Sequence, residues 1–365
     1  MRILVYGAGP LGSLFAARLQ QGGNDVSLLA RGQRLADLRQ HGIVLYDVQS
    51  GERTTTHVRV VESLSPDDAY DLVLVVMRKN HALQILPVLA ANDHTPNVLF
   101  LMNNAAGPGA LIKALGRERV LIGFPGAAGY RKGEMVHYLA GSEDEPWSVP
   151  FGEPDGRTTS RTRRVAQVLS TMPGFEGQIQ ENMDAWLKYH VAILMPSLAP
   201  ALYAAGLDHR RLARTRDLLV LTIRAVREAF QVLRALGYPV TPSKFKLLEW
   251  IPEPLLVGLI ALALQRWADE VKLEAALLRH ARAARDEVKH LTDEFLALAR
   301  ATAVPTPAID RLYPHLSPDA PLVTEESAAL PMRWRGVWIG AALLAGIAAA
   351  LWALLSALGQ FGRRR

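Results

Sequence analysis

The chain has 365 residues, about two domains' worth, and its 50% hydrophobic and 21% charged residues are typical of folded proteins rather than disordered or collagen-like ones. It contains no cysteine, which excludes disulfides, thiolate nucleophiles, cysteine zinc sites and iron–sulfur clusters. Five of the 41 lysines and arginines follow Pro331, so the net charge of +6 leaves 36 basic and 35 acidic groups in the first 330 residues. This nearly neutral body does not favour a nucleic-acid partner.

The first third of the chain alternates short β-rich runs with helical patterns. This alternation predicts a doubly wound parallel sheet of the α/β class. The expected strands are Arg2–Tyr6, Asp25–Ala30, Asp71–Met77, Asn97–Met102, Val120–Phe124 and Trp147–Phe151, and the expected helices are Leu11–Gln21, Gln33–Arg39 and His81–Ala90. Glycines at 22, 23 and 42 are expected to end the first two helices.

A glycine-rich loop connects the first strand to the first helix. It reads Gly7, Ala8, Gly9, Pro10, Leu11 and Gly12, which is a GxGxxG pattern between a strand and a helix. The first glycine permits a tight turn, the second lets the backbone approach a pyrophosphate, and the third allows close packing of helix on strand. The helix N-terminus attracts the phosphates. The loop therefore predicts a dinucleotide site, and the alternative is a glycine turn that binds nothing.

The residue after the second strand bears on which dinucleotide binds. An NAD site normally has Asp or Glu there to bind the ribose hydroxyls. Here the strand is followed by Arg31, with Arg34 one turn later. A guanidinium pairs well with a 2′-phosphate, which favours NADP(H) over NAD. The alternative for Arg31 is a solvated loop charge.

Long apolar helical patterns dominate after about residue 180. We expect residues 1–180 to form a Rossmann-type NADP-binding domain and residues 181–315 an all-α domain for substrate binding or dimerisation. Helices are expected over Leu212–Leu236, Leu256–Arg266 and Leu273–Ala301. Residues 316–335 are expected to be a polar linker. The ten histidines lack metal-ligand spacing and no GxSxG is present, so neither a metal site nor a hydrolase is favoured.

The residues from 336 to 358 form an uncharged run of 23 residues, long enough as a helix to span roughly 34 Å. Trp334, Trp338 and arginines on both sides suit interfacial anchoring, and residues 359–365 form a basic tail. We expect a single-pass C-terminal transmembrane helix in the lipid bilayer. With no signal peptide apparent and NADPH a cytosolic cofactor, the catalytic body is expected to be cytoplasmic. A buried core helix or a helix that supports a homodimer is the alternative.

Taken together, the glycine loop, Arg31 and the helical second half resemble the ketopantoate reductase family over about residues 1–315. This resemblance implies NADPH-dependent reduction of 2-dehydropantoate to pantoate, as in pantothenate synthesis. It further implies that Lys188, in the segment DAWLKYHVA, is the catalytic general acid and that Glu287 is a second catalytic residue. Asn104 resembles the family's asparagine near the nicotinamide and substrate, and Arg78 occupies the place of a lysine in the cofactor and substrate region.

The residues themselves leave alternatives open for each of these sites. Desolvation on an apolar helix would lower the pKa of Lys188, but a snorkelling lysine has the same pattern. Glu287 either holds the lysine or the substrate hydroxyl, or it is a surface helix charge. Asn104 either orients a ligand or forms a turn. Arg279 either clamps a substrate carboxylate or is a solvated helix charge.

The sequence departs from the family mainly on the substrate side. The departures are Ala105, Ala192, Pro196, Ala275, Arg279 and Lys289. They leave two functions open. One is a reductase of 2-dehydropantoate or another small 2-oxo acid, and the other is a membrane-tethered NADPH-binding module without turnover.

Overall fold

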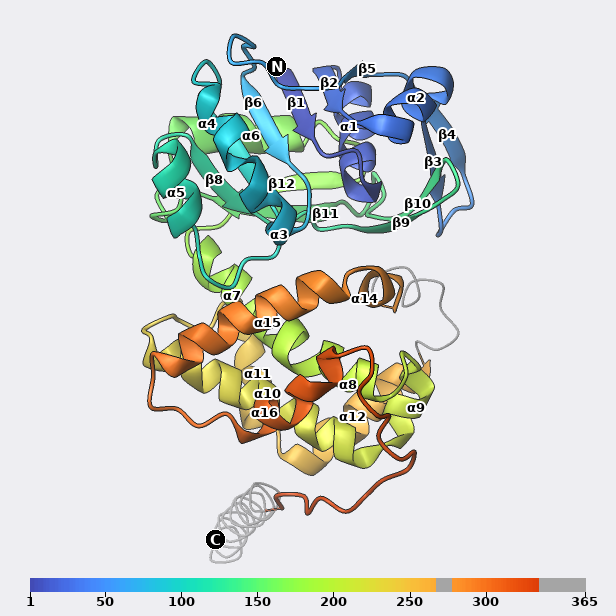
Figure 1. Ribbon diagram of the computed structural model, residues 1–365, viewed down its shortest axis with the longest axis vertical. Coiled ribbons are helices and arrows are strands. Elements are labelled where there is room, and N and C mark those ends of the chain that lie inside the picture. The colour runs from blue at the N-terminus through green and yellow to red at the C-terminus, as the bar shows by residue number, and fades with distance from the viewer. Residues whose placement is uncertain (267–277, 335–365) are drawn as a thin grey trace, which may run out of the picture.

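Side chains along β1 (Arg2–Tyr6) point alternately to the two faces of the large sheet. Ile3 and Val5 pack into one core cluster, while Leu4 and Tyr6 pack into another on the opposite face. The computed structural model describes residues 1–266 and 278–334, and Figure 1 shows a sheet domain above a helical domain. The sheet is covered by helices on both faces, as its continuously apolar strands require.

The large sheet has eight strands, and its neighbours are parallel except for one antiparallel pair, β8 with β11. In sheet order the strands are β12 (Phe175–Ile179), β11 (Trp147–Gly152), β8 (Val120–Gly123), β7 (Val98–Leu101), β6 (Leu72–Val75), β1, β2 (Asp25–Leu29) and β5 (Arg59–Val61). The helices of this domain are α1 (Pro10–Gln21), α2 (Gly32–His41), α3 (Lys79–Ala82), α4 (Leu86–Ala91), α5 (Gly109–Leu115) and α6 (Ser160–Leu169), and Leu83–Ile85 is a 3-10 turn. The predicted parallel α/β sheet is confirmed.

A second sheet of four strands packs against α1. Its order is β4 (Arg53–Thr56), β3 (Ile43–Asp47), β10 (Met135–Leu139) and β9 (Ala128–Lys132). Val136 and Tyr138 of β10 join the core cluster that contains the buried residues of α1. This sheet was not predicted, because β4 and β9 are largely exposed and carry too few apolar residues to show a strand pattern.

The second domain is helical, as predicted. Among the described residues, its helices are α7 (Met183–Ile193), α8 (Ala199–Ala204), α9 (His209–Arg214), α10 (Arg216–Ala235), α11 (Leu247–Trp250), α12 (Glu253–Arg266), α14 (Arg279–Ala283), α15 (Arg285–Arg300) and α16 (Pro307–Leu312), with a π-helical turn at Leu194–Leu198 and 3-10 turns at Ser243–Lys246 and Tyr313–Leu316. Tyr189, Phe230 and Phe295 lie fully buried at the centre of this domain.

Two of the predicted long helices are wrong as single elements. The helix expected over Leu212–Leu236 is interrupted at Thr215, whose ψ of 89° is not helical. In the described part of the helix expected over Leu273–Ala301, Ala284 separates α14 from α15 with φ −125° and ψ 29°. Tertiary contacts hold this second break, since the Tyr203 hydroxyl donates to the Ala281 carbonyl and the Arg285 guanidinium lies 3.8 Å from the Tyr203 ring centroid.

The segment expected as a polar linker is bound to the helical domain as far as Trp334. The backbone N–H groups of Ala329 and Leu330 donate to the Asp217 carboxylate, and Arg224 donates to the Pro331 carbonyl. The expected transmembrane helix and basic tail lie outside the described residues. Within the described ranges, each helix taken singly is too short or too polar to cross a bilayer, whereas one bent pair, Ser243–Trp250 with Glu253–Gln265, passes the same test jointly with a bend of 116°.

Candidate active site

The glycine loop has the geometry of a dinucleotide cradle. Gly7 adopts φ +120°, and a Cβ on Gly12 would lie 1.8 Å from the Gly7 carbonyl oxygen, so no side chain fits at position 12. A Cβ on Gly9 would meet no atom within 4 Å, which leaves room for a ligand at the start of α1. Gly9 is the N-cap of α1 and Pro10 its first residue, so the first-turn N–H groups point toward this opening.

A cavity of about 350 Å³ beside the loop contains three arginines. Arg31 follows β2, Arg34 lies on α2, and Arg131 comes from β9 of the second sheet. Burial, with a smaller contribution from the positive charge of Arg131, lowers the pKa of Arg34. Arg34 donates to the Ala8 carbonyl and to Ser13 Oγ, so it braces the loop, while Arg31 donates to the Tyr6 hydroxyl at 3.3 Å. The cavity suits an anionic group.

Two lysines are buried at the carboxyl ends of the neighbouring strands. Lys188 on α7 is 1% exposed and Lys79, after β6, is 3% exposed. Desolvation lowers the pKa of both side chains, and the charge of Lys188 further lowers the pKa of Lys79. The snorkelling alternative for Lys188 is wrong, because its ammonium group lies inside the molecule.

Each lysine has its own carboxylate. Lys188 Nζ donates to Asp184 one helical turn earlier and lies 4.6 Å from the Tyr238 ring centroid. Lys79 Nζ donates to Glu294 Oε2 at 2.7 Å. These pairs compensate the cost of burying the two cations. A carboxylate that holds Lys188 is therefore Asp184, which was not predicted from the sequence.

Asn104 connects the two lysines. Its Oδ1 accepts from Lys79 Nζ at 2.6 Å and from the Gly107 N–H at 2.9 Å, so it forms a turn and also orders a lysine. A Cβ on Gly107 would lie 2.9 Å from Lys188 Nζ, which places the turn directly against the second ammonium group. Asn104 Nδ2 is buried and has no hydrogen-bond partner among the described residues. An unpaired buried donor at this position suits a ligand with a carbonyl or carboxamide oxygen.

Glu287 lies beside this cluster, next to the Lys79 backbone and the Asn103 side chain. It is 2% exposed, so the surface-charge alternative is wrong. Desolvation raises its pKa to about 7, against the opposing charge of Arg78 and hydrogen bonds from the Lys79 backbone and the Asn103 side chain. Arg78 donates to Asp286 at 2.9 Å and so joins the sheet domain to α15. Arg279 is the first residue of α14, and its side chain lies outside what the structure describes.

The raised pKa of Glu287 predicts a pH dependence of stability. Between about pH 4.5 and pH 7 the folded chain holds a proton that the unfolded chain has released, so the free energy of unfolding falls as the pH rises through that window. Glu287→Gln should remove this loss, which is on the order of 3 kcal/mol above pH 7. Urea unfolding at several pH values measures it, with the exposed Glu62→Gln as control. If the free energy of unfolding changes equally with pH in the unmodified chain, Glu287→Gln and Glu62→Gln, the prediction is contradicted.

Five residues of the site were not predicted from the sequence: Lys79, Asn103, Arg131, Asp184 and Glu294. Asp184 carried a usable signal, because it precedes Lys188 by four residues and faces it on α7. Lys79 is adjacent to Arg78, which the resemblance had singled out. Glu294 and Arg131 carried no local signal, since the fold brings them to the site from α15 and from the second sheet.

Comparisons with known proteins show what the chain is similar to in sequence and in fold. Residues 3–148 match the family model described as Ketopantoate reductase PanE/ApbA. The chain is similar to this family over those residues. A ketopantoate reductase relative, the 2-dehydropantoate 2-reductase of Mesorhizobium japonicum, is 26% identical over 273 residues, which span 65% of this chain and 79% of that protein. YkpB of Bacillus subtilis, named an uncharacterized oxidoreductase, is 28% identical over 52% of this chain, and the match spans only 61% of its own length.

A solved structure extends the likeness in fold to both domains. The ternary structure of D-mandelate dehydrogenase with NADH and anilino(oxo)acetate superposes with a TM-score of 0.67 at 16% identity. It covers 87% of this chain and 97% of the other. At this identity the likeness shows the fold alone, including the helical domain that lies beyond the residues matched by the ketopantoate reductase family model.

Proposed function

We propose that this protein is an NADPH-dependent reductase of a small 2-oxo acid, 2-dehydropantoate or a close analogue, with Lys188 as general acid. The observation that carries the proposal is the position of the lysine–Asn104 cluster. In the sheet order β7, β6, β1, β2, it lies at the ends of β7 and β6, beside the glycine loop after β1. Ligands of open α/β sheets bind at this carboxyl edge.

The residues present fit a dinucleotide. The loop at Gly7 and Gly9 would hold its pyrophosphate, Arg31 and Arg131 its adenosine phosphate, and Asn104 Nδ2 its carboxamide. Three strand spacings separate β2 from β7, about 14 Å, so the arginine cavity and the lysine cluster mark two ends of an extended ligand. When bound, the reduced nicotinamide supplies a hydride to the carbonyl carbon of the substrate.

The chain's own residues then handle the proton. As negative charge develops on the carbonyl oxygen, the Lys188 ammonium donates a proton to it and becomes a neutral amine, which water reprotonates. Burial favours this step, because desolvation lowers the pKa of Lys188. Asp184 holds the ammonium in place, and Lys79 orients Asn104. Glu287, whose pKa is about 7, lies beside Arg78 and Asn103. Its protonation state therefore changes the net charge next to the lysine–Asn104 cluster.

NADPH oxidation by the purified full chain across a panel of 2-oxo acids tests the proposal. We expect turnover on 2-dehydropantoate or another branched 2-oxo acid. Oxidation on none of them would contradict it. The second candidate, an NADPH-binding module without turnover, is favoured by the neutralisation of both buried lysines by carboxylates and by the apolar Ala192 and Pro196. Tight NADPH binding without oxidation would select this candidate.

Arg31→Ala is expected to raise KM for NADPH about tenfold, because it removes a charge-assisted contact with the 2′-phosphate. KM for NADH, which lacks that phosphate, should not change. Arg131→Ala should act in the same direction. Steady-state kinetics with both cofactors measure the effect, with Arg39→Ala on the exposed side of α2 as the matched control. An equal rise in KM for both cofactors would indicate an NAD site instead.

We also propose that residues 336–358 anchor the chain in a bilayer, with the catalytic body on the cytoplasmic side. The support is the uncharged run of 23 residues between arginines and tryptophans. Retention of the chain in membranes after an alkaline carbonate wash checks the anchor. Release into the supernatant would contradict it.

A further inference from the structure

The helical domain exposes a group of large apolar side chains at the corner between α11 and α12. Leu247 and Trp250 on α11 are 60% and 80% exposed, and Leu255, Leu259 and Leu262 on α12 are 54%, 56% and 45% exposed. We call these five residues the α11–α12 apolar surface. An apolar patch of this kind on a folded domain indicates an interaction site.

The opposite face of α12 is also apolar. Leu256, Val257 and Leu264 are buried in the core of the helical domain. Between Glu253 and Arg266 the helix has no charged residue, whereas a helix on a water-facing surface normally places charges outward. One face of α12 therefore packs in the apolar core, and its exposed face is suited to an apolar partner.

The corner is firmly attached to the domain. Glu253, the first residue of α12, is 2% exposed, and its carboxylate accepts from Arg224 Nε at 2.9 Å and from Arg224 Nη2 at 2.8 Å. Arg227 donates to the Leu248 carbonyl at 3.0 Å. These bonds hold the two helices in their bent arrangement, so the exposure of the leucines is a property of the folded domain.

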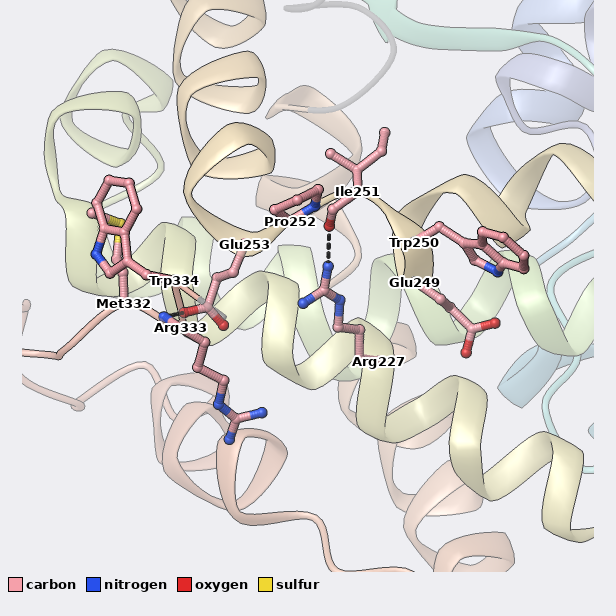
Figure 2. Close-up of a pocket in the computed structure, with 9 residues that line it drawn as sticks. All are labelled: Arg227, Glu249, Trp250, Ile251, Pro252, Glu253, Met332, Arg333 and Trp334. Carbon is pink, nitrogen blue, oxygen red and sulfur yellow. Dashed lines mark hydrogen bonds between the residues drawn. The ribbon is translucent and has the colours of Figure 1, made fainter. Parts of the chain in front are cut away.

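The rim of this surface carries the side chains that favour a membrane interface. Lys244 and Lys246 are exposed just before α11, and Trp334 is 48% exposed. Figure 2 shows Trp250 and Trp334 on opposite sides of the Ile251–Pro252 turn, with Arg333 beside Glu253. Tryptophan with lysine or arginine around an apolar centre is typical of helices that lie at the boundary of headgroups and acyl chains.

The described residues that precede the uncharged run contact the same corner. The Arg333 N–H donates to Glu253 Oε1 at 2.9 Å, and Met332 and Trp334 line the same pocket as Trp250. The run of residues 336–358 begins two positions after Trp334. The chain is therefore held at this corner up to Trp334, two residues before the proposed anchor begins.

We propose that the α11–α12 apolar surface rests at the boundary of headgroups and acyl chains of a lipid bilayer and forms a second membrane contact in addition to the proposed anchor. Because the inner face of α12 is buried in the domain, the helix lies along the membrane and does not cross it. Anionic headgroups would neutralise Lys244 and Lys246, whereas a second copy of this chain would bring more of the same positive charge.

This contact would also orient the active site. In Figure 1 the large sheet and α12 lie toward opposite ends of the molecule, with α15 between them. A body that rests on the membrane through α12 keeps the glycine loop away from lipid and open to a soluble cofactor. The proposal does not depend on whether the bound cofactor is turned over.

The absence of cysteine permits a direct test with one label. The full chain with Leu259→Cys is labelled with nitrobenzoxadiazole and reconstituted into vesicles of phosphatidylcholine and phosphatidylglycerol. The control is Ala90→Cys, on the exposed side of α4 in the sheet domain. We expect the label at 259 to emit further to the blue, to lose at least half its intensity to nitroxide-bearing lipid, and to resist aqueous iodide. The label at 90 should show the reverse. Thermal melting confirms that both variants are folded.

Three results would overturn the proposal. A chain that sediments with vesicles while iodide quenches both labels equally has its anchor but no second contact. A chain that does not sediment with vesicles has neither. If energy transfer between labels at 259 disappears on dilution with unlabelled chain, and lipid quenching is absent, the surface binds a second copy. NADPH oxidation, measured on the same samples, keeps failure of this proposal distinct from failure of the proposed reductase.

Discussion

Lys188→Ala is expected to lower kcat for 2-oxo acid reduction by about 10²–10⁴-fold and to leave KM for NADPH nearly unchanged. Without the Lys188 ammonium the carbonyl oxygen loses its proton donor, whereas the glycine loop and the arginine cavity that would hold the cofactor remain intact. Stopped-flow measurement of NADPH oxidation under single-turnover conditions isolates this step, because cofactor binding and product release do not contribute.

A matched control separates loss of the proton donor from loss of structure. Lys113→Ala removes an exposed lysine from α5 and should have the activity of the unmodified chain. The dissociation constant of NADPH shows whether Lys188→Ala is folded, since binding requires the sheet domain. A variant that binds NADPH normally and reduces substrate at the unmodified rate would remove Lys188 from the mechanism. Lys79, the other buried lysine at this edge, would then be the candidate general acid.

Lys79→Met is expected to lower the free energy of unfolding by about 3 kcal/mol or more. The variant leaves Glu294, only 16% exposed, without the ammonium that now lies 2.7 Å away, and it also removes the donor to Asn104 Oδ1. The carboxylate keeps the Ala106 N–H at 3.3 Å and His290 Nε2 at 3.4 Å, but it loses the lysine charge that offsets most of its desolvation. Urea unfolding, followed by the fluorescence of the tryptophans, measures the change.

Two further variants identify the origin of that loss. Lys79→Met combined with Glu294→Gln should recover most of the stability, because no buried charge is then left unpaired. Lys289→Met breaks the ion pair of Lys289 with Asp293, whose side chains are 54% and 43% exposed. This variant should lower the free energy of unfolding by less than about 1 kcal/mol. If Lys79→Met proves no more costly than Lys289→Met, then the buried pair contributes little to stability.

The local part of the fold could be predicted from short-range patterns. Continuous apolar runs indicated the central strands, and a glycine loop between a strand and a helix indicated the cradle, because the steric demand at Gly12 arises within a few residues. The breaks at Thr215 and Ala284 could not be predicted in this way. Both sit in amphipathic stretches with good helical periodicity, and contacts such as that of Arg285 with Tyr203 come from distant parts of the chain.

The candidate site likewise contains residues that could be predicted from the sequence and residues that only the fold brings together. Lys188 could be singled out from its helix and from a family resemblance, but its burial and its ion pair with Asp184 became apparent only with the fold. The presence of Glu294 and Arg131 at the site depends entirely on the fold, since α15 and the second sheet place them there. The exposure of Leu259 likewise could not be read from an apolar helix, because periodicity does not say which face is covered.

Sequence alone thus determined that this protein has a dinucleotide-type glycine loop on a parallel sheet, a helical second half and an uncharged C-terminal run, because each of these is encoded in neighbouring residues. Only the tertiary structure decided which charges are desolvated and paired, and which apolar face has no partner. Both depend on the distances between residues far apart in the chain. Those distances set the pKa values of the two lysines and of Glu287, and therefore the chemistry that the site can perform.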